Sequence, residues 1–133
     1  PEELRIPQYV KDETLTPLHQ NYKETADLEA ELPGLDVLYM TRIQKERFFN
    51  EEDYLRLKGC YELDEKLLQQ APPTMPVLHP LPRIDEIKPD VDNDPRAAYF
   101  DQVHNGVYIR MAIILALLGI PDPLTGKKVL ESI

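Results

Sequence analysis

A short apolar run that ends abruptly in charged residues is the clearest pattern along this chain. The run Val37–Met40 is rich in residues that favour strands, and the stretch Thr41–Arg47 that follows it is mostly polar. In open α/β sheets, ligands bind beyond the carboxyl ends of the strands. The pattern therefore predicts a strand that leads into a binding loop, with a solvated surface loop as the alternative.

Helix and strand patterns alternate around this run, which is typical of a parallel α/β sheet. Acidic residues mixed with alanine and leucine over Tyr22–Leu32 predict an exposed helix that Pro33 and Gly34 stop. Asn50, followed by acidic residues, predicts the capped start of a helix that runs to about Lys58. Weaker patterns predict a helix over Glu2–Lys11, strands over Leu15–His19, Tyr61–Leu63 and Met75–Leu78, and a helical turn over Asp64–Gln70.

The C-terminal part of the chain carries a long polar loop and a strongly apolar helix. The loop Arg83–Arg96 is long for a compact domain, and such loops are usually functional or mobile. Every residue over Val107–Leu118 except Arg110 is apolar, which predicts a helix over about Asn105–Leu118 that is buried nearly all round. This helix is shorter than the roughly 20 residues needed to cross a bilayer. The residues after it, Leu124–Ile133, are expected to form a tail.

Composition and charge argue against several classes of protein. The chain has 133 residues, an ordinary size for one domain, and 42% of them are hydrophobic, as in globular folds. Its net charge of −9, without a basic cluster, argues against nucleic acid or an anionic membrane as a partner. The single cysteine and the absence of metal-ligand spacing indicate a reducing, cytoplasmic setting and no metal. Because the chain opens on Pro1 instead of Met, we expect a fragment or an excised domain.

Alternating prolines mark a second candidate site. The segment His79-Pro80-Leu81-Pro82 lacks two backbone N–H donors, so it cannot continue a hydrogen-bonded strand. Its carbonyl groups are left to accept hydrogen bonds from a ligand that carries an NH₂ group. The alternative is a rigid turn that closes a strand. The histidine, between Leu78 and Pro80, is expected to be an oriented structural imidazole more than a general base.

Three segments together resemble one enzyme family. The segments Thr41–Arg47, Val77–Arg83 and Asp94–Phe100, followed by Asn105-Gly106, resemble signatures of the aspartate-binding half of aspartate carbamoyltransferases, in the same order and with similar spacing. The resemblance covers nearly all of residues 1–133, as one domain. It implies a three-layer, doubly wound α/β fold, with helices on both faces of a mostly parallel sheet. It also implies a carbamoyl-phosphate-binding domain that is absent from this chain.

The resemblance implies roles for individual residues. Arg42 would clamp a carboxylate of L-aspartate, and Gln44 would help to orient that substrate. The backbone of Leu81 and Pro82, with a cis peptide bond between them, would hold the carbamoyl group of carbamoyl phosphate. No residue of this chain is implied with certainty to be catalytic. Supporting positions in the loop and around the site are implied for Glu46, Arg47, Tyr54, Arg83 and Asp85.

The implied activity is transfer of a carbamoyl group from carbamoyl phosphate to the α-amine of L-aspartate, in pyrimidine biosynthesis and without a cofactor. The family's Ser-Thr-Arg-Thr and His-Pro-x-Gln segments do not occur here, so the isolated chain is expected to be inactive. The resemblance also implies a homotrimer, and it leaves regulatory chains or fused enzymes open as further partners. Aspartate is favoured over ornithine, because the chain has Pro80 where ornithine enzymes have cysteine, and it has no tryptophan.

A second hypothesis is a non-catalytic module that resembles a carbamoyltransferase domain. Such a module would serve oligomerisation or form part of a fused multienzyme chain. The sequence that precedes this chain in its parent protein distinguishes the two hypotheses. The enzyme hypothesis requires the Ser-Thr-Arg-Thr and His-Pro-x-Gln segments there, because they supply the grip on the phosphate.

Overall fold

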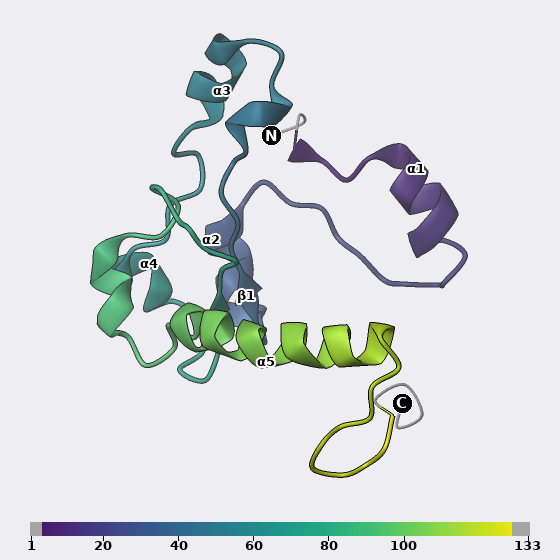
Figure 1. Cartoon of the computed structure of the whole chain (residues 1–133). Helices are drawn as coiled ribbons and strands as arrows, with labels where there is room; N and C mark the ends of the chain where they lie inside the picture. Colours follow the sequence, from purple (N-terminus) through teal and green to yellow (C-terminus); the bar gives the residue numbers. More distant parts are fainter. Residues whose placement is uncertain (1–3, 129–133) are drawn as a thin grey trace.

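A two-stranded parallel sheet lies at the centre of the fold (Figure 1). The computed structural model describes residues 4–128, apart from the side chain of Arg47. Strand β1 (Leu38–Tyr39) pairs with β2 (Val77–Leu78), and two isolated parallel bridges, Leu63 to Ile87 and Val77 to Ala97, lie outside these strands. The predicted α/β class with a parallel sheet is confirmed. The strands predicted over Val37–Met40 and Met75–Leu78 are both present, and each is shorter than predicted.

The helices are short except for the last. They are α1 (Gln8–Val10), which continues as a π-helical turn over Lys11–Leu15; α2 (Leu28–Glu31), which continues as a 3-10 turn over Leu32–Gly34; α3 (Glu51–Leu57); α4 (Glu65–Leu68); and α5 (Tyr99–Leu117). Further 3-10 turns span Lys45–Arg47 and Pro89–Asn93, the latter inside the long polar loop.

Side-chain caps set where three of these helices begin. Asp27, Asn50 and Asp64 each accept a hydrogen bond from the backbone N–H three residues later, at the starts of α2, α3 and α4. These bonds satisfy an N–H group that has no partner inside the helix. Beyond α3, Gly59 has a φ of +75°, which suits the left-handed turn after a helix. The predicted cap at Asn50 and the helical turn after Asp64 are therefore confirmed.

Three N-terminal predictions need correction. The helix predicted over Glu2–Lys11 begins only after Pro7 and continues to Leu15, and residues 1–3 lie outside the described part. The strand predicted over Leu15–His19 is wrong, because helical hydrogen bonds run through it, for example from the N–H of Leu18 to the carbonyl of Thr14. The helix predicted over Tyr22–Leu32 is mostly irregular, because it starts at the Asp27 cap.

One cluster of buried side chains forms the core. Its members come from both strands, from α4 and from the segments around them: Leu32, Leu38, Met40, Leu63, Leu68, Ala71, Met75, Val77, Ile87, Val91 and Tyr99. Along β1 the burial alternates, because Leu38 faces the core whereas Val37 and Tyr39 are 48% and 53% exposed. The continuous apolar run at β1 is thus a half-buried strand within this chain, and not a strand buried on both faces.

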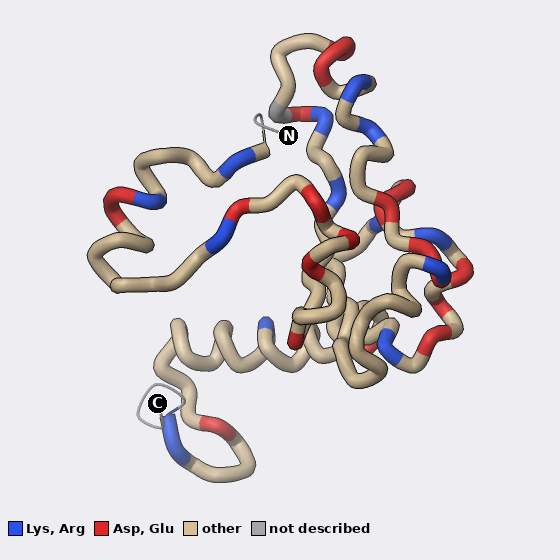
Figure 2. Tube along the Cα trace, turned by 180° about the vertical axis from the view of Figure 1, so that it is seen from behind, with Lys and Arg blue, Asp and Glu red and all other residues tan. Residues whose placement is uncertain are grey.

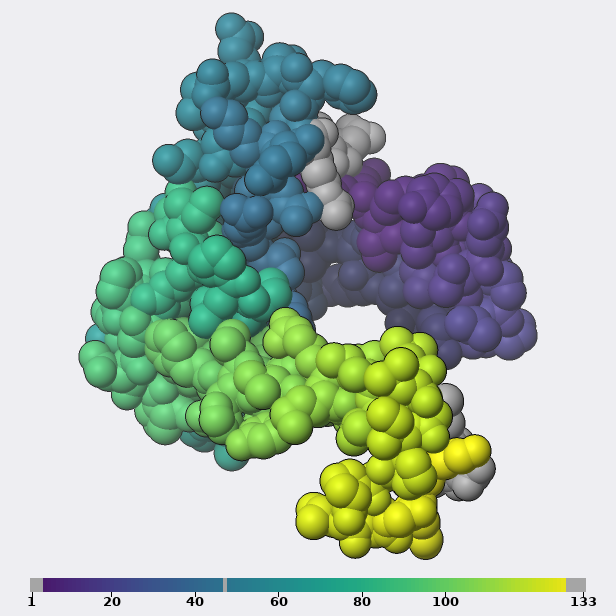
Figure 3. All heavy atoms as spheres, viewed as in Figure 1, coloured from purple at the N-terminus to yellow at the C-terminus, as the bar shows by residue number. Residues whose placement is uncertain are grey.

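Helix α5 differs most from its prediction. It begins at Tyr99 instead of near Asn105, and its apolar side chains are exposed, with Leu117 at 81% and Ile109 at 60%. Only its first turn packs against the core through Tyr99, and the helix then runs out from the sheet (Figures 1 and 3). The prediction of burial is wrong for this chain alone, because no other part of residues 4–128 covers the helix. Within that range no helix is both long and apolar enough to span a membrane.

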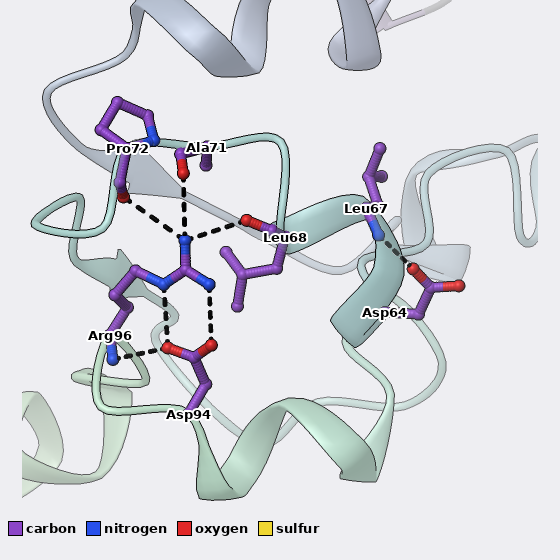
Figure 4. Close-up of polar contacts among 7 residues, drawn as sticks. All are labelled: Asp64, Leu67, Leu68, Ala71, Pro72, Asp94 and Arg96. Carbon is purple, nitrogen blue, oxygen red and sulfur yellow. Dashed lines mark hydrogen bonds and ion pairs between the residues drawn. The ribbon is translucent and has the colours of Figure 1, made fainter.

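Arg96 ties the turn after α4 to the segment beside β2 (Figure 4). Its Nη1 donates to the carbonyls of Leu68, Ala71 and Pro72 at 2.9, 3.2 and 3.3 Å, while Nε and Nη2 donate to the Asp94 carboxylate at 2.9 and 2.7 Å. The backbone of the same segment brackets β2, because the N–H of Val77 donates to the carbonyl of Arg96 at 2.8 Å. The guanidinium of Arg96 therefore helps to hold in place the segment that hydrogen-bonds to β2, the strand that leads to the proline segment.

Replacing Arg96 with methionine is expected to lower the free energy of unfolding by about 2–4 kcal/mol, because it removes the charged donor that three carbonyls share and leaves the Asp94 carboxylate without its cation. Urea denaturation of the purified chain, followed by circular dichroism, measures the change. The matched control is Arg56→Met on α3, where the side chain is 61% exposed. The control should change stability by less than about 0.5 kcal/mol, and equal effects of both substitutions would contradict this role of Arg96.

The Arg96–Asp94 pair also predicts a dependence of stability on pH. Hydrogen bonds from Arg96 hold the pKa of Asp94 below its ordinary value of 3.8. Because the folded-state pKa is the lower one, the pair stabilises the fold above about pH 4, and this contribution is lost as the pH falls further. The stability difference between the chain and Asp94→Asn should be constant near neutral pH and shrink on acidification. A difference that stays constant down to the acid transition would contradict this assignment.

Candidate functional site

An open cavity of about 820 Å³ lies at the carboxyl ends of β1 and β2. The loop after β1 contributes Arg42 and Gln44 to its lining, and the proline segment after β2 contributes Leu81 and Pro82. The two strands are parallel and paired, so the segments that follow them meet at one edge of the sheet. The structure thus brings these four predicted site residues together.

Arg42 is one of two arginines that line this cavity, and the other is Arg5. Its side chain is 36% exposed, and Nη2 lies 3.5 Å from Oε1 of Glu46, at the limit of a hydrogen bond. Such a loose, solvent-exposed pair contributes little energy. Glu46 is thus in loose contact with the guanidinium, and its role in orienting that group stays a prediction.

A smaller cavity shares Arg42 and several neighbouring residues with the first. It is lined by Thr41, Arg42, Ile43, Tyr54, Lys58, Gly59, Tyr61, Ile84, Asp85 and Glu86. Two of the predicted supporting residues, Tyr54 and Asp85, therefore lie beside Arg42. Lys58 approaches Asp85 at 4.0 Å between Nζ and Oδ2. The prediction for Arg47 concerns a side chain outside the described part of the structure.

Arg83 lies in a separate cluster. Its Nη2 donates to Oδ2 of Asp92 at 2.6 Å, and its Nη1 donates to the hydroxyl of Tyr99 at 3.2 Å. The hydrogen bonds that Arg83 donates to Asp92 raise the pKa of Arg83. Burial, followed by the Asp92 carboxylate, raises the pKa of Tyr99 to about 12. This cluster joins the long polar loop to the start of α5, and Arg83 does not line the cavity that holds Arg42.

His79 is the first residue of the proline segment, and it is fully buried at the lining of the cavity. Its Nδ1 accepts a hydrogen bond from the N–H of Leu81 at 2.9 Å, and its Nε2 lies 2.7 Å from Oε1 of Glu86. Both ring nitrogens are thereby engaged, as the prediction of an oriented structural imidazole requires. Leu81 has a φ of +45°, and the predicted cis peptide bond between Leu81 and Pro82 is confirmed.

Glu86 is almost as buried as His79, at 4% exposed. Burial by itself raises the pKa of this carboxyl group. Hydrogen bonds from backbone N–H groups, including those of Ile84 and Asp85, and from His79 outweigh that effect and lower the pKa overall. The group is therefore held as a carboxylate that accepts from the imidazole.

Sequence patterns did not reveal several residues around the cavity. Arg5 and Tyr61 line it although they lie far from the motifs along the chain. Gln102 of α5 accepts from the N–H of His79 at 2.9 Å and donates to the hydroxyl of Tyr39 at 3.1 Å. None of the three carries a local signal, because only the packing of distant segments brings them to the site.

The polar groups of the cavity suit an anion that carries an amino group. Two guanidinium groups, from Arg5 and Arg42, line a cavity in a chain whose net charge is −9. Figure 2 shows Lys and Arg positions as well as Asp and Glu positions over many parts of the trace, and several of the basic positions follow the loop after β1. Among residues 4–128, no group of three or more His, Cys, Asp or Glu could hold a metal ion. Carboxylate or phosphate recognition fits these donors best.

Comparison with known proteins gives a consistent family. The family model for the aspartate/ornithine carbamoyltransferase Asp/Orn binding domain matches residues 4–117. The chain is 56% identical over 132 residues to the aspartate carbamoyltransferase catalytic subunit of Bifidobacterium longum subsp. infantis, which covers 99% of this chain and 41% of that protein. It is 57% identical over 120 residues to the corresponding subunit of Lachnoclostridium phytofermentans, and this match covers 90% of this chain and 39% of that protein.

Solved structures of aspartate transcarbamoylases also match this chain. The catalytic subunit of aspartate transcarbamoylase from M. jannaschii matches with a TM-score of 0.74 and 39% identity, over 86% of this chain and 37% of that chain. The enzyme from Trypanosoma cruzi in complex with carbamoyl phosphate and aspartate matches with a TM-score of 0.75 and 37% identity, over 86% and 38%. The chain thus spans about two fifths of the length of the curated relatives it matches. It belongs to the aspartate/ornithine carbamoyltransferase family and corresponds to the Asp/Orn-binding domain of that family.

Proposed function

We propose that this chain is the aspartate-binding half of an aspartate carbamoyltransferase. The parent enzyme would transfer the carbamoyl group of carbamoyl phosphate to L-aspartate, giving N-carbamoyl-L-aspartate and phosphate in de novo pyrimidine biosynthesis. One observation carries the proposal: Arg42 shares a single cavity with Leu81 and Pro82 at the carboxyl ends of the paired strands. That cavity combines a cationic fork with backbone acceptors, one for each substrate.

Arg42 supports aspartate as the substrate. A planar guanidinium presents paired donors that match a carboxylate, and Gln44 lines the same cavity with an additional donor. The weak contact with Glu46 leaves room for a substrate carboxylate to take its place. A cation at this position would repel the side-chain amine of ornithine, so it favours an acidic substrate within the family.

The proline segment supports carbamoyl phosphate as the second substrate. Prolines at positions 80 and 82 remove two backbone donors, so the carbonyl groups here have few partners within the segment. Such carbonyls can accept from the NH₂ of the carbamoyl group. Catalysis would then depend on orientation and on donors for the charge that develops on the leaving phosphate. Those phosphate donors would come from the other domain, so this chain alone would be inactive.

Helix α5 supports the need for a partner domain. Its exposed apolar side chains, such as Ile109, Ile113 and Leu117, form a surface of the kind that protein contacts cover. The relatives are more than twice as long as this chain, so the remainder of the parent chain would be the natural cover. We propose that it is the N-terminal carbamoyl-phosphate domain, in a cytoplasmic homotrimer with sites between subunits. Regulatory chains that bind to this unit, or enzymes fused to its chain, are further partners within the proposal.

The non-catalytic module would also use α5 for docking, but it would have no need of Arg42 in the cavity. The experiment therefore turns on that residue. In the full-length parent, Arg42→Ala is expected to weaken binding of a bisubstrate analogue that joins a phosphonate to aspartate by about 2–5 kcal/mol, because a charged contact is lost. Isothermal titration calorimetry measures this change.

Arg56→Ala is the matched control, because this residue lies on α3 and does not line either cavity at Arg42. The control should bind the analogue as tightly as the wild type does. Unchanged affinity in Arg42→Ala would contradict the proposed aspartate site. Failure of the wild-type parent to bind the analogue would favour the module.

A further inference from the structure

A buried polar pair adjoins the proposed carbamoyl site, and the proposed function gives it no role. His79 is 0% exposed and Glu86 is 4% exposed. A buried pair of this kind is weak evidence for stability, because apolar side chains of similar volume often stabilise a core equally well. The pair is therefore best explained by what it holds in place.

The hydrogen bonds fix the protonation of the ring. The N–H of Leu81 donates to Nδ1, so Nδ1 carries a lone pair and the ring proton is on Nε2. That proton is donated to Oε1 of Glu86 at 2.7 Å. On the far side, Oε2 of Glu86 accepts from the N–H groups of Ile84 and Asp85, at 3.2 Å each. The carboxylate is thus oriented by backbone, and it orients the imidazole in turn.

The backbone of His79 is fixed as well. Its N–H donates to Oε1 of Gln102 at 2.9 Å, which links it to α5. The residue therefore has three fixed points: its own N–H and both ring nitrogens. Of these three groups, only Nδ1 forms a hydrogen bond with another residue of the proline segment, namely Leu81.

Leu81 is the residue that needs such support. Its φ of +45° lies in the left-handed region, which is unfavourable for a residue with a Cβ atom. A non-glycine residue keeps this conformation only where its surroundings impose it. The hydrogen bond from its N–H to His79 is one such constraint, and Leu81 itself lines the cavity.

We propose that His79 and Glu86 are positioning residues for carbamoyl phosphate. The imidazole, oriented by Glu86, holds Leu81 in the left-handed conformation and so sets the direction of the carbonyl groups that receive the carbamoyl NH₂. The histidine touches no substrate in this arrangement and transfers no proton. This inference rests on the proposed function, because it assigns the acceptors to that substrate.

Two substitutions of His79 separate this role from a purely structural one. In asparagine, Oδ1 takes the place of Nδ1 and can accept from the N–H two residues later, as in an Asx turn, but the contact with Glu86 is lost. In glutamine, the amide nitrogen takes the place of Nε2 and can donate to Glu86, but no acceptor faces Leu81. His79→Asn therefore keeps the contact with Leu81 and loses the one with Glu86, whereas His79→Gln keeps the contact with Glu86 and loses the one with Leu81.

Steady-state kinetics of the full-length parent and its unfolding midpoint are measured for both variants. We expect His79→Gln to raise the KM for carbamoyl phosphate about tenfold, the usual effect of one lost hydrogen bond, and His79→Asn to raise it by less than about threefold. His79→Asn should nevertheless be the less stable protein, because it leaves Glu86 buried without the imidazole. KM for aspartate should change little in either variant.

A structural role predicts the opposite relation, in which carbamoyl phosphate affinity falls together with stability. Parallel changes of affinity and stability, or no change of affinity in either variant, would overturn the inference while leaving the proposed function intact. A wild-type parent that does not bind carbamoyl phosphate would instead overturn the proposed function and this inference with it.

A measurement on the wild type keeps the inference testable if a variant does not fold. The ¹⁵N chemical shifts of the His79 ring, in the labelled parent, should be those of the tautomer protonated at Nε2. A ring protonated at Nδ1 cannot accept from Leu81, so that result would overturn the inference.

Discussion

The site depends on the parallel pairing of β1 with β2. Leu38 opposes Val77 and Tyr39 opposes Leu78, so both chains leave the sheet at the same edge and in the same direction. The loop with Arg42 and the segment with Leu81 and Pro82 are therefore neighbours, although they are far apart along the sequence. A register shift of one residue would turn the core-facing side chains of a strand outward and would also displace its site residues.

The pairing is short, and much of its support comes from polar contacts around it. Arg96 ties the segment beside β2 to the turn after α4, and the backbone of that segment brackets Val77. On the inner side, His79 is held by Glu86 and by Gln102 of α5. Each of these contacts satisfies a buried or half-buried polar group, and together they limit the freedom of the proline segment.

The exposed surface of α5 and the lining of the cavity both bear on the proposed partner domain. The helix presents apolar side chains that the rest of residues 4–128 does not cover, and the cavity is lined by Arg5, Arg42 and the proline segment. The chain matches the Asp/Orn-binding domain of its family and spans about two fifths of the length of its relatives. In the proposed enzyme, the partner domain would both cover α5 and supply the donors for the phosphate.

The sequence by itself determined the features that depend on local chemistry. The Asn50 cap, the turn at Gly59, the two strands and the non-strand proline segment follow from residues within a few positions of one another. The motifs also identified Arg42, Gln44, Leu81 and Pro82, all of which line one cavity. Such features are set by backbone hydrogen bonding and by proline and glycine conformations, which a short window contains.

Only the tertiary structure decided where distant residues meet. It placed Arg83 with Asp92 and Tyr99 instead of in the cavity, brought Arg5 and Tyr61 to the lining, and joined Gln102 to His79. It also showed α5 exposed, whereas the apolar pattern predicted burial. An apolar pattern states that a helix needs a covering surface, but it cannot state which chain segment provides that surface.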